Sequence, residues 1–199
     1  MKKLLAFIFT LFFISAPLKA DEGGIAFVKA LTDDIIKNVL SSNIPDEEKI
    51  KIFHDRFQKD LDITTIGKHV VGTYWKKASK EEQEEFIGAF FDFATKSWAD
   101  KFNLYTGQEL AFTGSRPAKS NQLFVDSIVK GNPPAEVSWR LKKQGNTYKI
   151  TDIIIEHVSM VKSYRDEYVS FLQKNGGKLP TLTKTLKEKS AAFKLTGNK

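Results

Sequence analysis

Apolar residues recur every three or four positions along the first half of the chain, which is the spacing of amphipathic helices. The first such helix is predicted over about residues 24–41, with a buried face of Ile25, Val28, Leu31, Ile35 and Val39. A second helix follows the turn at Pro45, with a buried face of Ile50, Phe53, Phe57 and Leu61. Asp62 is placed to cap a short third helix that ends near Gly72.

The longest and most aromatic helix is predicted from Ser79 to Gly107. Ser79 and Glu82 form a capping box, which marks where the helix begins. Two adjacent rows of apolar side chains follow, one with Phe86, Phe90 and Phe93 and the other with Ile87, Phe91, Ala94, Trp98, Phe102 and Tyr105. This stripe is wider than one ordinary core contact needs, so it is either covered by the rest of a small domain or shared with an apolar ligand.

After Gly107 the period of the pattern changes to two, which is typical of strands. Alternation around residues 110–112, 123–128, 137–142 and 148–155 predicts four strands, separated by turn signals at 114–117, 131–134 and 144–146. One face of this antiparallel meander is strongly apolar, whereas Arg140 and Lys142 indicate that the other face is exposed to solvent. Ser159 then caps a fifth helix that ends at residues 176–177, and Pro180 begins a last one, so the sequence predicts an α+β fold.

The first twenty residues predict a signal peptide that is not part of the fold. Lys2 and Lys3 precede an apolar run, Pro17 breaks that run, and Ala20 offers a small residue at the cleavage position. We expect export and a mature chain of residues 21–199, with an uncleaved N-terminal anchor as the alternative. That chain is expected to be one domain, α-rich over 24–106, with a sheet over 108–156, C-terminal helices over 159–194 and a short tail from Lys194.

Charge and cysteine content narrow the function classes. The sequence contains no cysteine, which excludes disulfides, thiol chemistry and a lipoprotein anchor. The net charge of +7 includes three lysines of the predicted signal peptide, so the mature chain keeps a mild basic excess that permits contact with anionic lipid headgroups. No basic cluster is interleaved with aromatic residues on a strand, so we expect no nucleic-acid partner.

The sequence offers little catalytic chemistry. It has no nucleophile elbow, phosphate-binding loop or zinc-protease motif, and His54 and His69 lack metal-ligand spacing, so we expect no metal and no cofactor. Glu156 and His157 could form an acid–base pair at the end of the last strand, but neighbours on a strand point to opposite faces. We therefore assign no catalytic residue and keep an enzyme using Asp152, Glu156 and His157 as the alternative.

The surplus of apolar side chains suits a lipid carrier. Leaving the roughly 30 methylenes of two acyl chains in water would cost about 25 kcal/mol. A soluble carrier must therefore bury both tails in a dry cavity near the upper end of the usual range of roughly 300–1,000 Å³. Carrier, enzyme and structural adaptor with a filled interior remain open on these grounds.

Two blocks of sequence carry a family resemblance. The first runs from Asp62 through Gly72, Tyr74 and Trp75 into the Phe-rich helix, and the second joins the strands around Trp139 and 148–152 to the helix start at 158–160. Their order and spacing resemble the MlaC family, also called the toluene-tolerance or ABC-transporter auxiliary family, over about residues 25–186. The family usually has Gly where His157 stands; Gly permits an unusual backbone angle that His adopts only at some cost.

The resemblance implies helices packed around a curved four-stranded antiparallel sheet that encloses an apolar cavity. It also implies a monomeric periplasmic phospholipid carrier, which moves lipid between an outer-membrane lipoprotein complex and an inner-membrane ABC transporter with an MCE-domain ring and maintains outer-membrane lipid asymmetry. A hopanoid or another apolar lipid is the alternative ligand. We expect the cavity to be lined by Val71, Tyr74, Phe90, Phe91, Ala94, Trp98, Phe102, Val137, Trp139, Leu141, Ile153, Ile155, Val158 and Met160. Which of these line a cavity and which form ordinary core is left open by the sequence.

Overall fold

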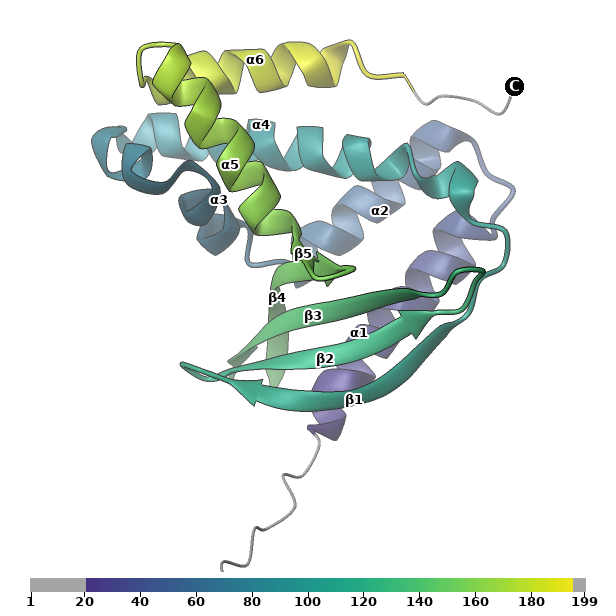
Figure 1. Ribbon diagram of the computed structural model, residues 1–199. Helices are drawn as coiled ribbons and strands as arrows, with labels where there is room; N and C mark the ends of the chain where they lie inside the picture. Colours follow the sequence, from purple (N-terminus) through teal and green to yellow (C-terminus); the bar gives the residue numbers. More distant parts are fainter. Residues whose placement is uncertain (1–20, 195–199) are drawn as a thin grey trace, which may run out of the picture.

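Helices, then strands, then helices follow one another along the chain of the computed structural model (Figure 1). The structure describes residues 21–194, so the predicted signal peptide and all but the first residue of the predicted C-terminal tail lie outside the described residues. Within the described part, no helix combines the length and the apolar character that crossing a membrane requires. The α+β class predicted from the change of period is confirmed.

Of the N-terminal helices, the third begins at its predicted cap, and the first begins two residues before its predicted start. Helix α1 (Glu22–Ile35) is capped by Asp21 and continues as a π-helix, η1 (Ile36–Leu40). Helix α2 (Asp46–Asp60) begins after Pro45. Helix α3 (Ile63–Val71) is capped by Asp62, whose carboxylate accepts a hydrogen bond from the Thr65 amide at 3.1 Å. A 3₁₀-helix, η2 (Gly72–Lys77), then leads to the longest helix.

Helix α4 (Lys80–Ala99) has the predicted capping box at Ser79 and Glu82 but ends before the predicted stop at Gly107. A short 3₁₀-helix, η3 (Phe102–Leu104), follows it. The early end turns Phe102 toward α2, where its ring meets the Phe53 ring edge-on with 5.1 Å between centroids. This tertiary contact overrides the helical periodicity that the sequence continues past residue 99.

The sheet contains β1 (Leu110–Ala118), β2 (Gln122–Val129), β3 (Ala135–Gln144), β4 (Thr147–Ile155) and β5 (Val158–Ser159), in that order and all antiparallel. The two-residue β5 adds to the four predicted strands. The turn predicted at 114–117 is wrong, because these residues belong to β1 and the chain reverses at Ser120 and Asn121. Gly114 follows an irregularity in the ladder, and Pro117 is tolerated because β1 is an edge strand.

A β-bulge next to Thr151 changes which residues of β4 face the core. Strict alternation from Tyr148 and Ile150 would place Asp152 on the apolar face. The register instead shifts between Arg140 and Leu141, so Asp152 lies opposite Arg140 and Ile153 lies opposite Trp139. Because directly opposed residues share a face, the bulge puts Ile153 on the apolar side of the sheet.

Helix α4 contributes side chains to two apolar clusters. Phe91 belongs to the cluster formed with α1, α2 and the sheet. Phe86 and Phe90 belong to the cluster formed with α3, α5 (Met160–Lys174) and α6 (Leu179–Ala191). Ile87 and Ala94 of the second predicted row also pack with this cluster, whereas Phe91, Trp98 and Phe102 pack with the cluster of the sheet. The predicted stripe therefore serves two different contacts, which explains why it is so wide.

Candidate functional site

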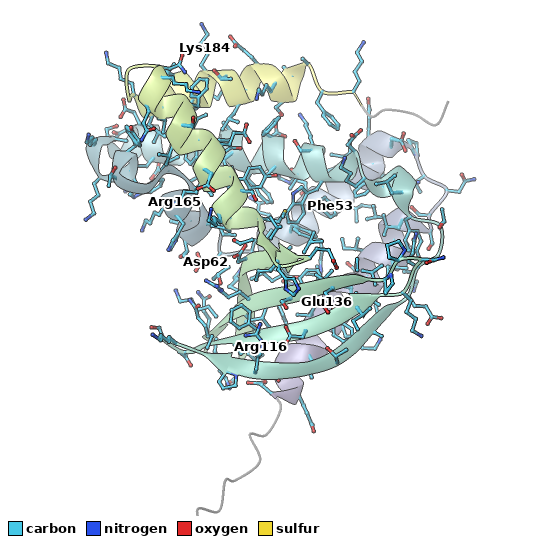
Figure 2. The ribbon with its side chains drawn as sticks, in the orientation of Figure 1. Phe53, Asp62, Arg116, Glu136, Arg165 and Lys184 are labelled. Atoms are coloured by element: carbon cyan, nitrogen blue, oxygen red, sulfur yellow. The ribbon has the colours of Figure 1, made fainter. Side chains whose placement is uncertain are left out.

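An apolar hollow of about 480 Å³, here called the main hollow, lies between the helices and the apolar face of the sheet. Phe53 and Phe57 of α2 form one side of it, and Val137, Trp139 and Ile153 of the sheet form the opposite side. Figure 2 shows Phe53 in the space between the helices and the sheet. A hollow of this size falls within the range of small-molecule sites, roughly 300–1,000 Å³.

Two smaller hollows adjoin the main hollow, and Phe57 lines all three. A side hollow of about 220 Å³ continues along α1 and the π-helix and shares Ile35, Leu40 and Trp139 with the main hollow. An inner hollow of about 50 Å³ lies between α3, α4 and α5, and shares Trp98 and Met160 with the main hollow. The three together form one continuous apolar region through the middle of the molecule.

The buried polar side-chain atoms of the described wall residues are bonded to protein groups. The Trp98 indole nitrogen donates a hydrogen bond to the Tyr164 hydroxyl oxygen at 3.2 Å. The Trp139 indole nitrogen donates to the Ser127 hydroxyl at 3.1 Å, and that hydroxyl donates to the Val137 carbonyl at 2.9 Å. Burial raises the pKa of Tyr164, so its hydroxyl keeps its proton across the physiological range. An apolar ligand in this region therefore contacts carbon atoms of the wall and leaves no buried hydrogen-bond donor of these groups unsatisfied.

Aromatic contacts fix the shape of the wall. The Phe53 ring lies 4.2 Å from the Phe57 ring, and the Phe57 ring meets the Trp98 ring edge-on at 5.5 Å between centroids. Together with the contact between Phe53 and Phe102, these pairs link α2 to α4 and η3. Such pairs hold their rotamers by packing on one another, so this side of the main hollow is preformed.

One end of the main hollow is exposed. Ile155 lines that end and is 40% exposed, whereas Ile153, two residues earlier on β4, is 5% exposed. Val158 and Leu104 are also exposed for apolar residues, at 52% and 68%. Among the described residues that line the main hollow, Lys101 is the single charged one.

Ten of the fourteen residues expected from the sequence border the inner or the main hollow. These are Phe90, Phe91, Ala94, Trp98, Phe102, Val137, Trp139, Ile153, Ile155 and Met160.

The other four lie elsewhere. Val71 is fully buried in the cluster around α5 and α6, and Leu141 is fully buried beneath α1, beside Gly24. Tyr74 packs at the edge of the first of these clusters, with the Lys77 ammonium 5.5 Å from its ring centroid. Val158 projects from the β4–β5 hairpin.

Sequence reasoning missed the contribution of the first two helices. Ile35, Leu40, Phe53 and Phe57 all line the main hollow, although their spacing reads as an ordinary buried face. The amphipathic period reports only that a residue faces inward, so it carries no signal that separates these residues from core.

The residues considered for catalysis are divided between two places. Asp152 is buried and accepts hydrogen bonds from the Ser159 hydroxyl at 2.6 Å and the Val161 amide at 3.1 Å, which fixes the start of α5. Glu156 and His157 do not continue the strand as predicted. Both have positive φ, +48° and +64°, and they form the exposed two-residue turn between β4 and β5.

Comparison with known proteins gives consistent matches. The family model described as MlaC protein matches residues 29–188. The intermembrane phospholipid transport system binding protein MlaC of Haemophilus influenzae is 20% identical over 87% of this chain and 86% of its own length. Toluene tolerance protein ttg2D of Pseudomonas putida is 21% identical over 76% of this chain and 74% of its own length.

A solved structure shares the fold. The phospholipid-binding protein of Ralstonia solanacearum, determined in complex with a phospholipid, superimposes with a TM-score of 0.73 at 21% sequence identity. The match covers 84% of this chain and 97% of the other.

Proposed function

Because this chain belongs to the MlaC family, we propose that it carries phospholipid between membranes, with the lipid tails buried in the main hollow. The observation that carries this proposal is the continuous apolar region between α2, α4 and the sheet, in whose wall the buried indole nitrogens are already hydrogen-bonded. The names of its relatives, which refer to phospholipid transport and binding, support the same ligand class.

The energetics of the tails explain why a carrier needs this hollow. Each methylene removed from water contributes about 0.8 kcal/mol, so an acyl chain binds wherever it can replace water by carbon. The main hollow offers two opposed apolar walls, and the side hollow and inner hollow give a long or second chain room to continue. The headgroup needs no buried site, because it can stay in water at the exposed end.

We further propose that the carrier works in the periplasm as one domain and one copy. It would take lipid from, or give it to, an outer-membrane lipoprotein complex on one side and an inner-membrane ABC transporter with an MCE-domain ring on the other. The predicted signal peptide supports export, and the word "intermembrane" in the name of the Haemophilus influenzae relative supports a route between two membranes. Maintenance of outer-membrane lipid asymmetry follows if the exchange runs in one net direction.

Native mass spectrometry of the mature chain, purified without detergent, tests the proposal. We expect the mass of the chain plus one or more phospholipids, identified by fragmentation after the lipid is released. If the preparation carries a hopanoid, the proposed carrier function stands and the proposed phospholipid ligand is wrong. A chain that stays empty both as isolated and after incubation with phospholipid vesicles would contradict the proposal.

A further inference from the structure

Lys101 stands out because it brings a charge to an otherwise uncharged hollow. It follows α4 and its capping residue Asp100, it is exposed, and it lines the main hollow beside Phe102 and Tyr105. Within residues 21–194, no ion pair to a neighbouring carboxylate is found for Lys101. A lysine so placed can lay its aliphatic stem along the apolar rim and keep its ammonium in water.

The side hollow also bears charge, but there the charge is compensated. Glu109 lines the side hollow, and its carboxylate lies 2.7 Å from the Lys130 ammonium. This contact lowers the pKa of Glu109, so the pair stays ionised and neutral overall at physiological pH. An anionic group would gain little at Glu109, whereas at Lys101 it would meet an ammonium without an ionic partner in the described chain.

Glu156 of the β4–β5 turn and Glu136 of β3 likewise interact with neighbouring groups of the protein. The Glu156 carboxylate accepts a hydrogen bond from the Glu136 amide, and the Glu136 carboxylate lies 3.7 Å from His157 Nε2. Figure 2 shows Glu136 on β3, below this hairpin. Neither carboxylate lines the main hollow, which leaves Lys101 as the ionic group at its rim.

We propose that Lys101 binds the phosphodiester of the lipid headgroup and so orients the lipid, with its tails toward Ile153 and its phosphate at the exposed end. This inference rests on the proposed carrier function and adds to it a preference for phosphate-bearing lipids over uncharged lipids with the same tails. The contact is exposed and screened by salt, so it contributes selectivity of a few fold, while the buried tails supply most of the affinity.

A competition between two lipids with identical tails tests the preference. The delipidated mature chain is incubated with an equimolar mixture of dioleoyl phosphatidylglycerol and dioleoylglycerol, and the bound ratio is read by native mass spectrometry. We expect Lys101→Gln to lower the ratio of phosphatidylglycerol to diacylglycerol by roughly three- to fivefold, the size of one exposed ion pair. Lys101→Arg should retain the ratio, and Lys119→Gln, at an exposed turn between β1 and β2, should leave it unchanged.

The outcomes separate this inference from the carrier function. If the wild-type chain binds both lipids and Lys101→Gln leaves the ratio unchanged, the role of Lys101 is overturned and the carrier function stands. If the wild-type chain binds neither lipid, the carrier function itself fails. In a separate experiment, the lipid-loaded chain is incubated with glycerol phosphate, which has the anion but no acyl tails. If glycerol phosphate displaces the bound lipid at equal concentration, Lys101 belongs to a site for free phosphate, and the headgroup assignment is overturned.

Discussion

The indole nitrogen of Trp98 donates a hydrogen bond to the hydroxyl oxygen of Tyr164 at 3.2 Å, and this bond ties α4 to α5 at the wall of the inner hollow. It crosses between the two apolar clusters, since Trp98 packs with the sheet-side cluster and Tyr164 with the cluster of α3, α5 and α6. The same bond supplies the partner that an indole N–H needs when it faces a hydrocarbon ligand.

Tyr164→Phe removes that partner and keeps the ring. We expect the free energy of unfolding in urea to fall by about 1–2 kcal/mol, because the Trp98 N–H is left without its acceptor. Tyr105→Phe is the matched control: Tyr105 also borders the main hollow, and no hydrogen bond joins its hydroxyl to a described residue. Equal losses in the two variants would show that the Trp98–Tyr164 bond has no special role.

Val137→Arg tests whether the main hollow holds the lipid. Val137 lies directly opposite Ile155, which is 40% exposed, so the stem of the new side chain can fill the hollow while the guanidinium reaches water. We expect a folded protein by circular dichroism that loads phospholipid roughly tenfold less, or not at all, by native mass spectrometry. Glu136→Arg adds the same group at the neighbouring, exposed position of β3 and should load normally.

The bond between Tyr148 and Asp21 predicts how stability depends on pH. The Tyr148 hydroxyl donates to the Asp21 carboxylate at 2.7 Å, while Asp21 also caps α1. Burial and this bond raise the pKa of Tyr148 to about 12. Because the unfolded chain ionises near pH 10, the stabilisation is present below about pH 10 and is lost as the pH rises toward 12.

The comparison with Tyr148→Phe isolates this effect. Urea unfolding at closely spaced pH values should show a steeper fall for the wild-type chain between pH 10 and 12 than for the variant. At acid pH the same bond acts through Asp21, because the hydrogen bond from Tyr148 lowers the pKa of the Asp21 carboxyl. The stabilisation by the Asp21 carboxylate is therefore complete above the usual carboxyl pKa and is lost as the pH falls through the lowered value. Parallel alkaline curves for the two proteins would refute the role of this bond.

The features that the sequence predicted correctly are local ones. The caps at Asp62, Ser79 and Ser159 depend on residues three positions apart, and all three are confirmed. The antiparallel order of the strands follows from short connections and alternating apolar residues. Each of these can be recognised from a few neighbouring residues, which is why no structure was needed to find them.

The features that could not be predicted depend on distant residues. Helix α4 ends early where Phe102 meets Phe53 of α2, a contact between residues 49 positions apart. The bulge that turns Ile153 toward Trp139 leaves no mark in the pattern around residue 151. Whether Val71 or Phe57 faces a hollow depends on how three helices pack, and both read equally as buried positions.

His157→Gly tests whether the left-handed backbone of the turn between β4 and β5 costs stability. His157 has φ +64° and Glu156 has φ +48°, as the two central residues of a type I′ hairpin turn require. A side chain in this left-handed region costs about 1–2 kcal/mol, and the extra freedom of glycine in the unfolded chain offsets about 0.5–1 kcal/mol of the relief. We therefore expect His157→Gly to raise the free energy of unfolding by about 0.5–1 kcal/mol.

The amount of bound phospholipid is a second quantity to measure for His157→Gly. The His157 side chain is exposed and does not line any of the three hollows. Its contact with the Glu136 carboxylate joins two exposed groups, and such contacts contribute little to stability. Loading of phospholipid should therefore be the same in His157→Gly and in the wild-type chain, whereas an enzyme that used His157 would lose turnover in this variant. His157→Ala is the control for the backbone, because alanine removes the imidazole and keeps the strain of the positive φ. A gain in stability with alanine as large as with glycine would show that the imidazole causes the effect, and would contradict the explanation by backbone strain.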